Sequence, residues 1–138
     1  MTPRGKVTKQ NRTILLVDDE KPWLDIMSHV LTEKSFKVMT AISGVEALKK
    51  LSSPLKPDLI LSDVRMPDMN GFDLYEHVKA VPQNKAIPYV FMSSIDDYDA
   101  IHVAKQLGAD GYVTKPFDID DAKTTINQLL TKFIKPAI

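Results

Sequence analysis

The sequence contains no cysteine, little net charge and no long apolar run. The absence of cysteine excludes disulfides, thiolate metal sites and cysteine nucleophiles. Lysine plus arginine and aspartate plus glutamate both number 18, so no bulk charge favours nucleic acid or an acidic membrane. Apolar runs such as 14–17 are too short to span a bilayer. Basic residues near the N-terminus are not followed by the apolar stretch of a secretory signal. We therefore expect one soluble, cytoplasmic domain.

Short apolar runs alternate with longer amphipathic segments over most of the 138 residues. This alternation predicts an α/β fold, in which helices cover both faces of a doubly wound parallel sheet. The predicted strands span 13–17, 36–41, 59–62, 88–92 and 111–113, and the predicted helices about 22–34, 43–51, 72–79, 97–107 and 119–133. We expect a flexible leader over 1–12, a folded domain over 13–133 and a short tail over 134–138.

Polar residues suited to phosphoryl chemistry follow four of the five predicted strands. Asp18 and Asp19 follow the first strand, Asp63 the third, Ser93 the fourth and Lys115 the fifth. Each has a simpler explanation when taken alone, such as a helix cap, a loop carboxylate or a surface charge. Because ligands bind beyond the carboxyl ends of parallel strands, the set as a whole indicates a phosphate site.

Three carboxylates gathered at one sheet edge repel one another. Two unit charges about 4 Å apart cost about 4 kcal/mol at an effective dielectric near 20, so protons or a hard cation must neutralise them. Oxygen-only ligands favour Mg²⁺, with Mn²⁺ as an alternative. A carboxylate is also an acceptable nucleophile for phosphate, and a lysine and a hydroxyl stabilise the transferring group.

Four stretches of the chain closely resemble the receiver domains of bacterial response regulators. They are 14–20 (ILLVDDE), 57–71 (PDLILSDVRMPDMNG), 93–94 (SS) and 108–117 (GADGYVTKPF). The resemblance implies a (βα)5 sheet with the flavodoxin-like strand order 2-1-3-4-5. It also implies a signalling switch in a two-component system or phosphorelay. Such a switch is not an enzyme, except for its own phosphoryl transfer and autodephosphorylation.

The resemblance assigns the phosphorylation site and the metal ligands. Asp63 would accept the phosphoryl group from the histidine of a sensor kinase or of a histidine phosphotransfer protein. Asp19 and Asp63 would ligate Mg²⁺ directly, the backbone carbonyl of Arg65 would be a third ligand, and Asp18 would act through water.

The resemblance also assigns the conformational switch. Ser93 would hydrogen-bond one phosphoryl oxygen and Lys115 would pair with another, while the ring of Tyr112 moves inward. The surface around the fourth helix, fifth strand and fifth helix would then change its affinity for an output partner or domain. The bond between Lys115 and Pro116 is expected to be cis, and Pro67 and Gly71 would shape the loop behind the phosphate.

Departures from the family pattern refine these expectations. Ser93 and Ser94 replace the more usual threonine and alanine. Ile95 cannot orient an attacking water, so autodephosphorylation should be slow. The last helix lacks the basic pattern of receivers that dimerise to drive winged-helix domains. We expect no direct nucleic acid binding and no membrane contact. The sequence does not decide whether phosphorylation produces a homodimer, or whether this chain stands alone or is a fragment of a larger regulator.

Two classes of protein with a related fold fit the sequence less well. An aspartate-nucleophile phosphatase needs a second acid two residues after the nucleophile, where this chain has Arg65. A flavin-binding protein of the same topology would need phosphate-cradling amides after the first strand, where two acids stand instead. A pseudo-receiver, an interaction module that is not phosphorylated, remains the alternative.

Overall fold

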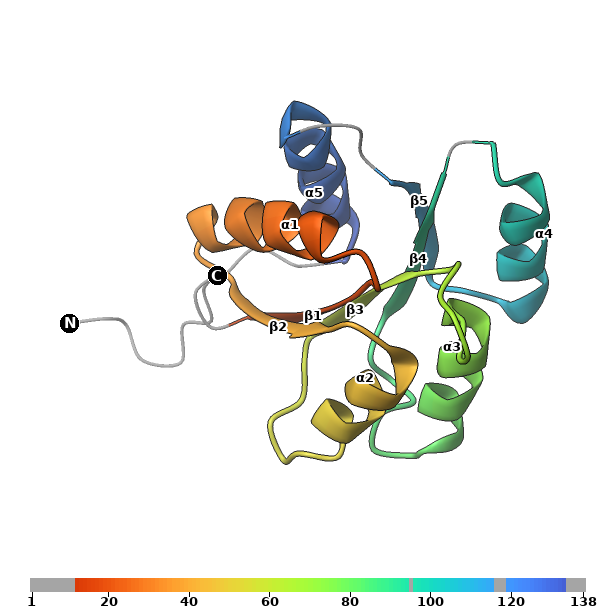
Figure 1. Ribbon diagram of the computed structural model, residues 1–138. Coiled ribbons are helices and arrows are strands. Elements are labelled where there is room, and N and C mark those ends of the chain that lie inside the picture. The colour runs from red at the N-terminus through yellow and green to blue at the C-terminus, as the bar shows by residue number, and fades with distance from the viewer. Residues whose placement is uncertain (1–11, 95, 116–118, 134–138) are drawn as a thin grey trace.

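The computed structural model describes residues 12–94, 96–115 and 119–133, in which five strands alternate with five helices (Figure 1). The strands are β1 (Thr13–Val17), β2 (Lys37–Ala41), β3 (Leu59–Asp63), β4 (Tyr89–Ser93) and β5 (Gly111–Thr114). The helices are α1 (Lys21–Glu33), α2 (Gly44–Leu51), α3 (Gly71–Ala80), α4 (Tyr98–Leu107) and α5 (Ile119–Phe133).

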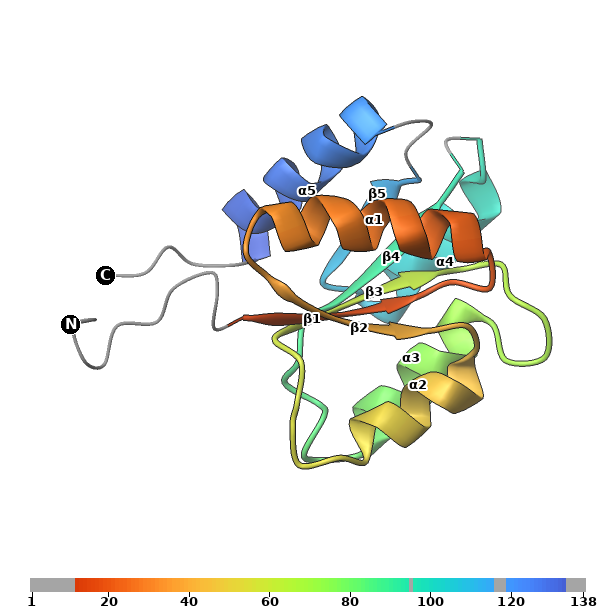
Figure 2. The same ribbon diagram turned by 60° about the vertical axis from the view of Figure 1, so that its left-hand side comes forward.

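The strands form one parallel sheet in the order β2-β1-β3-β4-β5, which confirms the predicted fold class and strand order. Helices α1 and α5 cover one face, and α2 and α3 cover the other (Figures 1 and 2). Strand β3 lies in the middle of the sheet, between β1 and β4. Its carboxyl end is therefore flanked by the ends of both neighbours.

The core has two halves, one on each face of the sheet. In β1, Ile14 and Leu16 pack with α1 and α5, whereas Leu15 and Val17 pack with residues of α2, α3 and α4. Successive side chains of a strand point to opposite faces, so a strand covered on both sides must be apolar throughout. This accounts for the continuous apolar runs in the sequence.

Helix ends are held by side-chain caps. The Ser43 hydroxyl accepts the Glu46 amide at the start of α2, while the Glu46 carboxylate accepts the Ile42 amide. A complete capping box that the sequence analysis did not identify joins Asn70 and Asp73 at the start of α3. These caps fix where the loops beyond the strand ends turn back into helices.

Several predictions concern parts of the chain outside the described residues. They are the cis bond to Pro116, the effect of Ile95, and the leader and tail, so the division into 1–12, 13–133 and 134–138 stays a prediction. Within the described ranges, no helix has both the length and the apolar character needed to cross a membrane.

Candidate functional site

Two buried carboxylates lie at the carboxyl ends of neighbouring strands. Asp18 directly follows β1 and Asp63 is the last residue of β3, with exposed fractions of only 2% and 4%. The Asp18 amide donates to the Ala41 carbonyl, which extends the pairing of β1 with β2 by one residue. The main chain thus holds both acids at the same edge of the sheet.

Lys115, directly after β5, places a positively charged side chain beside these carboxylates. Its Nζ lies 2.8 Å from Asp18 Oδ2, 2.7 Å from Glu20 Oε1 and 3.7 Å from Asp63 Oδ2. Its backbone amide donates to the Ser93 carbonyl at 2.7 Å, which anchors it beside β4. Burial lowers the pKa of the ammonium, but Asp18 and Glu20 outweigh burial and raise it. Lys115 is therefore held charged at the predicted site.

Glu20 is a site residue that the sequence analysis missed. Carboxylate oxygens of Asp18, Glu20 and Asp63 all lie within 4.8 Å of one another. Asp19, which the resemblance implies as a metal ligand, is exposed but close enough to raise the pKa of Asp63. The unbroken acidic run 18–20 was the available signal, yet only its first two members were assigned a role.

The Asp63 carboxyl has an unusually high pKa. Burial, the dominant cause, and the charge of Asp18 raise it to about 7, although Lys115 lowers it. Burial also raises the pKa of Asp18, against the opposing effect of Lys115. Two neighbouring acids whose pKa values are both raised by burial indicate that the site favours additional positive charge.

The donor set fits a hard divalent cation. The buried Asp18 Oδ2 atom is paired with the Lys115 ammonium at 2.8 Å. Three carboxylates supply the oxygen ligands that Mg²⁺ or Mn²⁺ prefers, without any sulfur or imidazole. A divalent cation would add positive charge to the site and relieve the repulsion between the acids.

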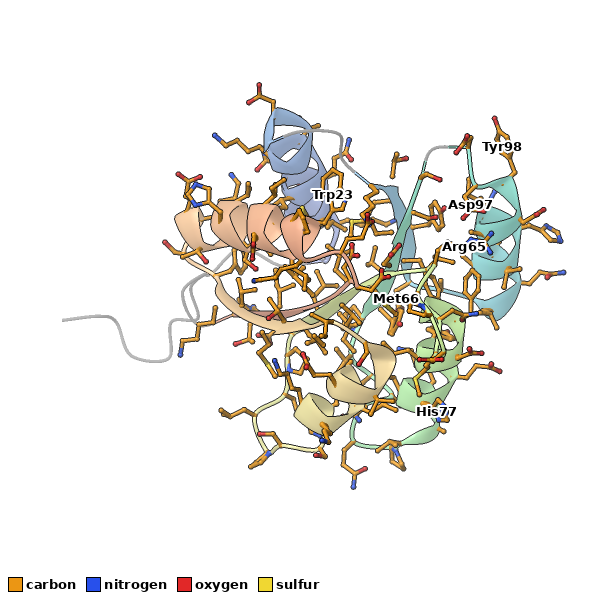
Figure 3. The ribbon with its side chains drawn as sticks, viewed as in Figure 1. Trp23, Arg65, Met66, His77, Asp97 and Tyr98 are labelled. Atoms are coloured by element: carbon orange, nitrogen blue, oxygen red, sulfur yellow. The ribbon has the colours of Figure 1, made fainter. Side chains whose placement is uncertain are left out.

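Ser93 and a second ion pair form a network beside this site. The buried Ser93 hydroxyl donates to Asp97 Oδ2 at 2.9 Å. Arg65 binds the same carboxylate in bidentate fashion, through Nε at 2.9 Å and Nη2 at 2.7 Å, and Figure 3 shows the two side chains next to each other. The hydrogen bond from Arg65, and to a smaller extent that from Ser93, lowers the pKa of Asp97 to about 2. Nothing in the sequence analysis identified Asp97.

Tyr112 of β5 is half-buried, with its hydroxyl inside the protein. This hydroxyl has no hydrogen-bond partner among the described residues. Burial raises the pKa of Tyr112, and the nearby Ser93 side chain acts in the opposite direction. The ring packs at the edge of the core on the α2, α3 and α4 face. Its polar end therefore lies close to the side chain predicted to switch.

These positions can be compared with known proteins. The family model described as "Response regulator receiver domain" matches residues 14–127, which is most of the chain. The chain belongs to the response regulator receiver family. As a receiver domain it is a signalling switch of the two-component type.

Individual relatives agree with this assignment. The response regulator SaeR of Staphylococcus aureus is 37% identical over 123 residues, covering 88% of this chain and 52% of SaeR. The chain thus spans about half the length of the curated relatives it matches. The chemotaxis response regulator CheY4 of Vibrio cholerae has a TM-score of 0.75 and 32% identity, covering 86% and 98% of the two chains. The phosphorylated cyanobacterial phytochrome response regulator RcpA has a TM-score of 0.80 and 25% identity, covering 90% and 94%.

Proposed function

We propose that this receiver domain accepts a phosphoryl group on Asp63 from a phosphohistidine, in a reaction that requires a divalent cation. The main support for this proposal is the set of charged groups around Asp63. A buried carboxylate on the central strand has an ammonium 3.7 Å away and two further carboxylates around it. That a relative has been solved as the phosphorylated RcpA supports the same chemistry.

In the transfer step, an Asp63 carboxylate oxygen attacks phosphorus, and the phosphorus–nitrogen bond breaks as the electron pair returns to the imidazole of the donor. Lys115, already held near Asp63, neutralises charge on one phosphoryl oxygen. The Ser93 hydroxyl donates to another. The product is an aspartyl-phosphate on the protein.

The cation would be Mg²⁺, or Mn²⁺ in its place, held by Asp18, Asp19, Asp63 and the backbone carbonyl of Arg65. Glu20 offers a further carboxylate. When bound, the cation supplies positive charge that neutralises phosphoryl oxygens and keeps the Asp63 carboxyl ionised despite its raised pKa. We propose that Ser93 and Tyr112 then change the face formed by α4, β5 and α5, which controls the output.

The first test is intact mass after incubation with acetyl phosphate and Mg²⁺. We expect one phosphoryl group on the wild type and none on Asp63→Asn, because asparagine is not a nucleophile for phosphorus. A matched control is Asp58→Asn, since Asp58 precedes β3 at its opposite end and accepts the Thr13 amide. The control should be phosphorylated like the wild type. Absence of an adduct on the wild type would instead favour the pseudo-receiver.

The phosphoryl group is expected to be long-lived. Arg65 is committed to its bidentate pair with Asp97, and the apolar Ile95 offers no group to orient water. The measurement is the decay of the phosphorylated mass after the donor is removed. A half-life of seconds in the purified protein would contradict this expectation.

Trp23 fluorescence is expected to report cation binding. Lys115 Nζ lies 5.5 Å from the centre of the Trp23 ring while it pairs with Asp18 and Glu20. A cation that takes these carboxylates as ligands would loosen the lysine and change the charge over the indole. Emission should therefore change saturably during a Mg²⁺ titration, and the change should be much smaller in Lys115→Gln. Binding seen by calorimetry without a change in emission would refute the coupling.

A further inference from the structure

The carboxylate of Asp97 joins groups from three parts of the fold. Oδ2 accepts the Ser93 hydroxyl at 2.9 Å and Arg65 Nε at 2.9 Å. Oδ1 accepts Arg65 Nη2 at 2.7 Å and the Ala100 amide at 3.3 Å, the latter as the N-cap of α4. The end of β4, the loop after β3 and the start of α4 therefore meet on one side chain.

Ser93 donates to Asp97 even though the Tyr112 hydroxyl, which is unpaired among the described residues, lies nearby. Ser93 is only 2% exposed, so its hydroxyl proton needs a partner within the protein. Its main chain is fixed, because β4 pairs with β5 at Ser93 and Thr114 and the Ser93 carbonyl accepts the Lys115 amide. Only the hydroxyl can be redirected, and it can donate its one proton to one strong acceptor at a time.

We propose that Asp97 is a resting-state latch, which holds the Ser93 hydroxyl until a phosphoryl group on Asp63 takes it away. The inference deepens the proposed function and rests on it. Asp97 acts through Ser93 and is therefore a positioning residue. When Ser93 leaves, α4 loses one anchor at its N-terminus, next to Tyr98, which is 75% exposed at the edge of the molecule (Figure 3).

The simpler explanation is that Asp97 only caps α4. The substitution Asp97→Asn separates the two roles, because asparagine caps helices as well as aspartate does. With its oxygen kept on the Ala100 amide, its NH₂ group replaces Oδ2 and cannot accept the Ser93 hydroxyl. The cap is retained and the latch is removed.

The test measures binding of beryllofluoride, a phosphoryl mimic, by calorimetry in excess Mg²⁺. We expect Asp97→Asn to bind about tenfold more tightly than the wild type, because one hydrogen bond to a charged acceptor no longer has to be broken. Asp99→Asn is the matched control: it removes the same charge from the first turn of α4 but has no hydrogen bond to Ser93. Its affinity should stay within about twofold of the wild type, as expected for an exposed charge.

Loss of negative charge near the site could by itself favour an anion, so the comparison is repeated in a Ser93→Ala background. If Asp97 acts through the hydroxyl, Asp97→Asn should change affinity there by less than about twofold. Equal tightening in both backgrounds, or none in either, would overturn the latch. If the wild type does not bind the mimic at all, the proposed function fails and the latch with it.

A second variant acts in the opposite direction and does not touch the cap. Arg65, with 64% of its side chain exposed, neutralises Asp97 and competes with Ser93 for it. In Arg65→Gln the carboxylate becomes a stronger acceptor for Ser93, so the mimic should bind up to about fivefold more weakly. This effect should again disappear in the Ser93→Ala background. Unchanged or tighter binding of Arg65→Gln would overturn the latch even if Asp97→Asn fails to fold.

Discussion

Replacing Asp63 by asparagine is expected to stabilise the protein in the presence of a chelator, by up to about 4 kcal/mol at neutral pH and above. The pKa of this carboxyl rises from 3.8 in its ordinary environment to about 7 in the folded protein. Ionising it at neutral pH therefore costs the folded state free energy that the unfolded state does not pay. Asparagine has nearly the same shape and no charge, so it removes the cost.

The pH dependence gives the sign of this effect. Between about pH 4 and pH 7 the folded protein keeps a proton on Asp63 that the unfolded chain has released, so wild-type stability falls as pH rises through this range. Asp63→Asn should lack that part of the slope. Urea unfolding at pH 4 and pH 7.5 measures it: the two proteins should be similarly stable at pH 4 and differ at pH 7.5. Equal stability at both values would show that the Asp63 carboxyl is not strained by burial.

Gly71→Ala is the second substitution with a large expected effect. A Cβ atom at Gly71 would lie 2.3 Å from the Asp63 carbonyl oxygen and 3.0 Å from Val64 Cα. Both are backbone atoms, which cannot rotate away. The hydrogen bond from the Gly71 amide to the Val64 carbonyl also holds Gly71 close to this segment. Either α3 or the end of β3 must move. We expect a loss of about 1–3 kcal/mol in stability, as for other overpacked interiors, and slower phosphorylation because Asp63 is displaced.

Gly44→Ala is a matched control for this substitution. Gly44 is the first residue of α2, as Gly71 is of α3, and a Cβ there would also be crowded, at 2.5 Å from Met69 Sδ. All the close atoms there belong to the flexible Met69 side chain, whose Sδ and Cγ can rotate away, although its Cβ is also near, at 3.0 Å. Thermal unfolding and the rate of phosphorylation by acetyl phosphate measure both variants. If Gly44→Ala is as damaging as Gly71→Ala, contact with the Asp63 main chain is not the cause.

The fold was predictable because its signals are local. A continuous apolar run such as Ile14–Val17 identifies a strand covered on both faces, and the polar residue after it marks the edge where ligands bind. For the same reason Asp18, Asp63, Ser93 and Lys115 could be assigned to one edge before their distances were known. The order of strands and helices along the chain is enough to predict which residues lie at this edge, and no side-chain contact has to be known.

The rest depended on contacts between residues distant in sequence and on loop conformation. Arg65 and Asp97 are 32 positions apart, and nothing in either segment indicates that they pair. The predicted helix begins at Asp97, whereas in the structure Asp97 is the N-cap of a helix that begins at Tyr98. Glu20 reaches Lys115 from 95 positions away because the chain turns after Asp18, whose Oδ1 accepts the Glu20 amide.

The position of the strands in the sheet has a consequence for dynamics. The proposed phosphorylation site, Asp63, lies on β3, which is buried along its whole length and paired on both sides. Tyr112 and Thr114 lie on β5, a four-residue strand at the edge of the described sheet, next to β4. Amide hydrogen exchange follows local opening, which is most costly where a strand has two neighbours and least costly at an edge. Asp63 is therefore expected to lie in the slowly exchanging part of the protein, and the proposed switch residue Tyr112 in a part that opens more readily. If Asp63 is phosphorylated as proposed, the modification would alter the population of open states around β5 without loosening β3.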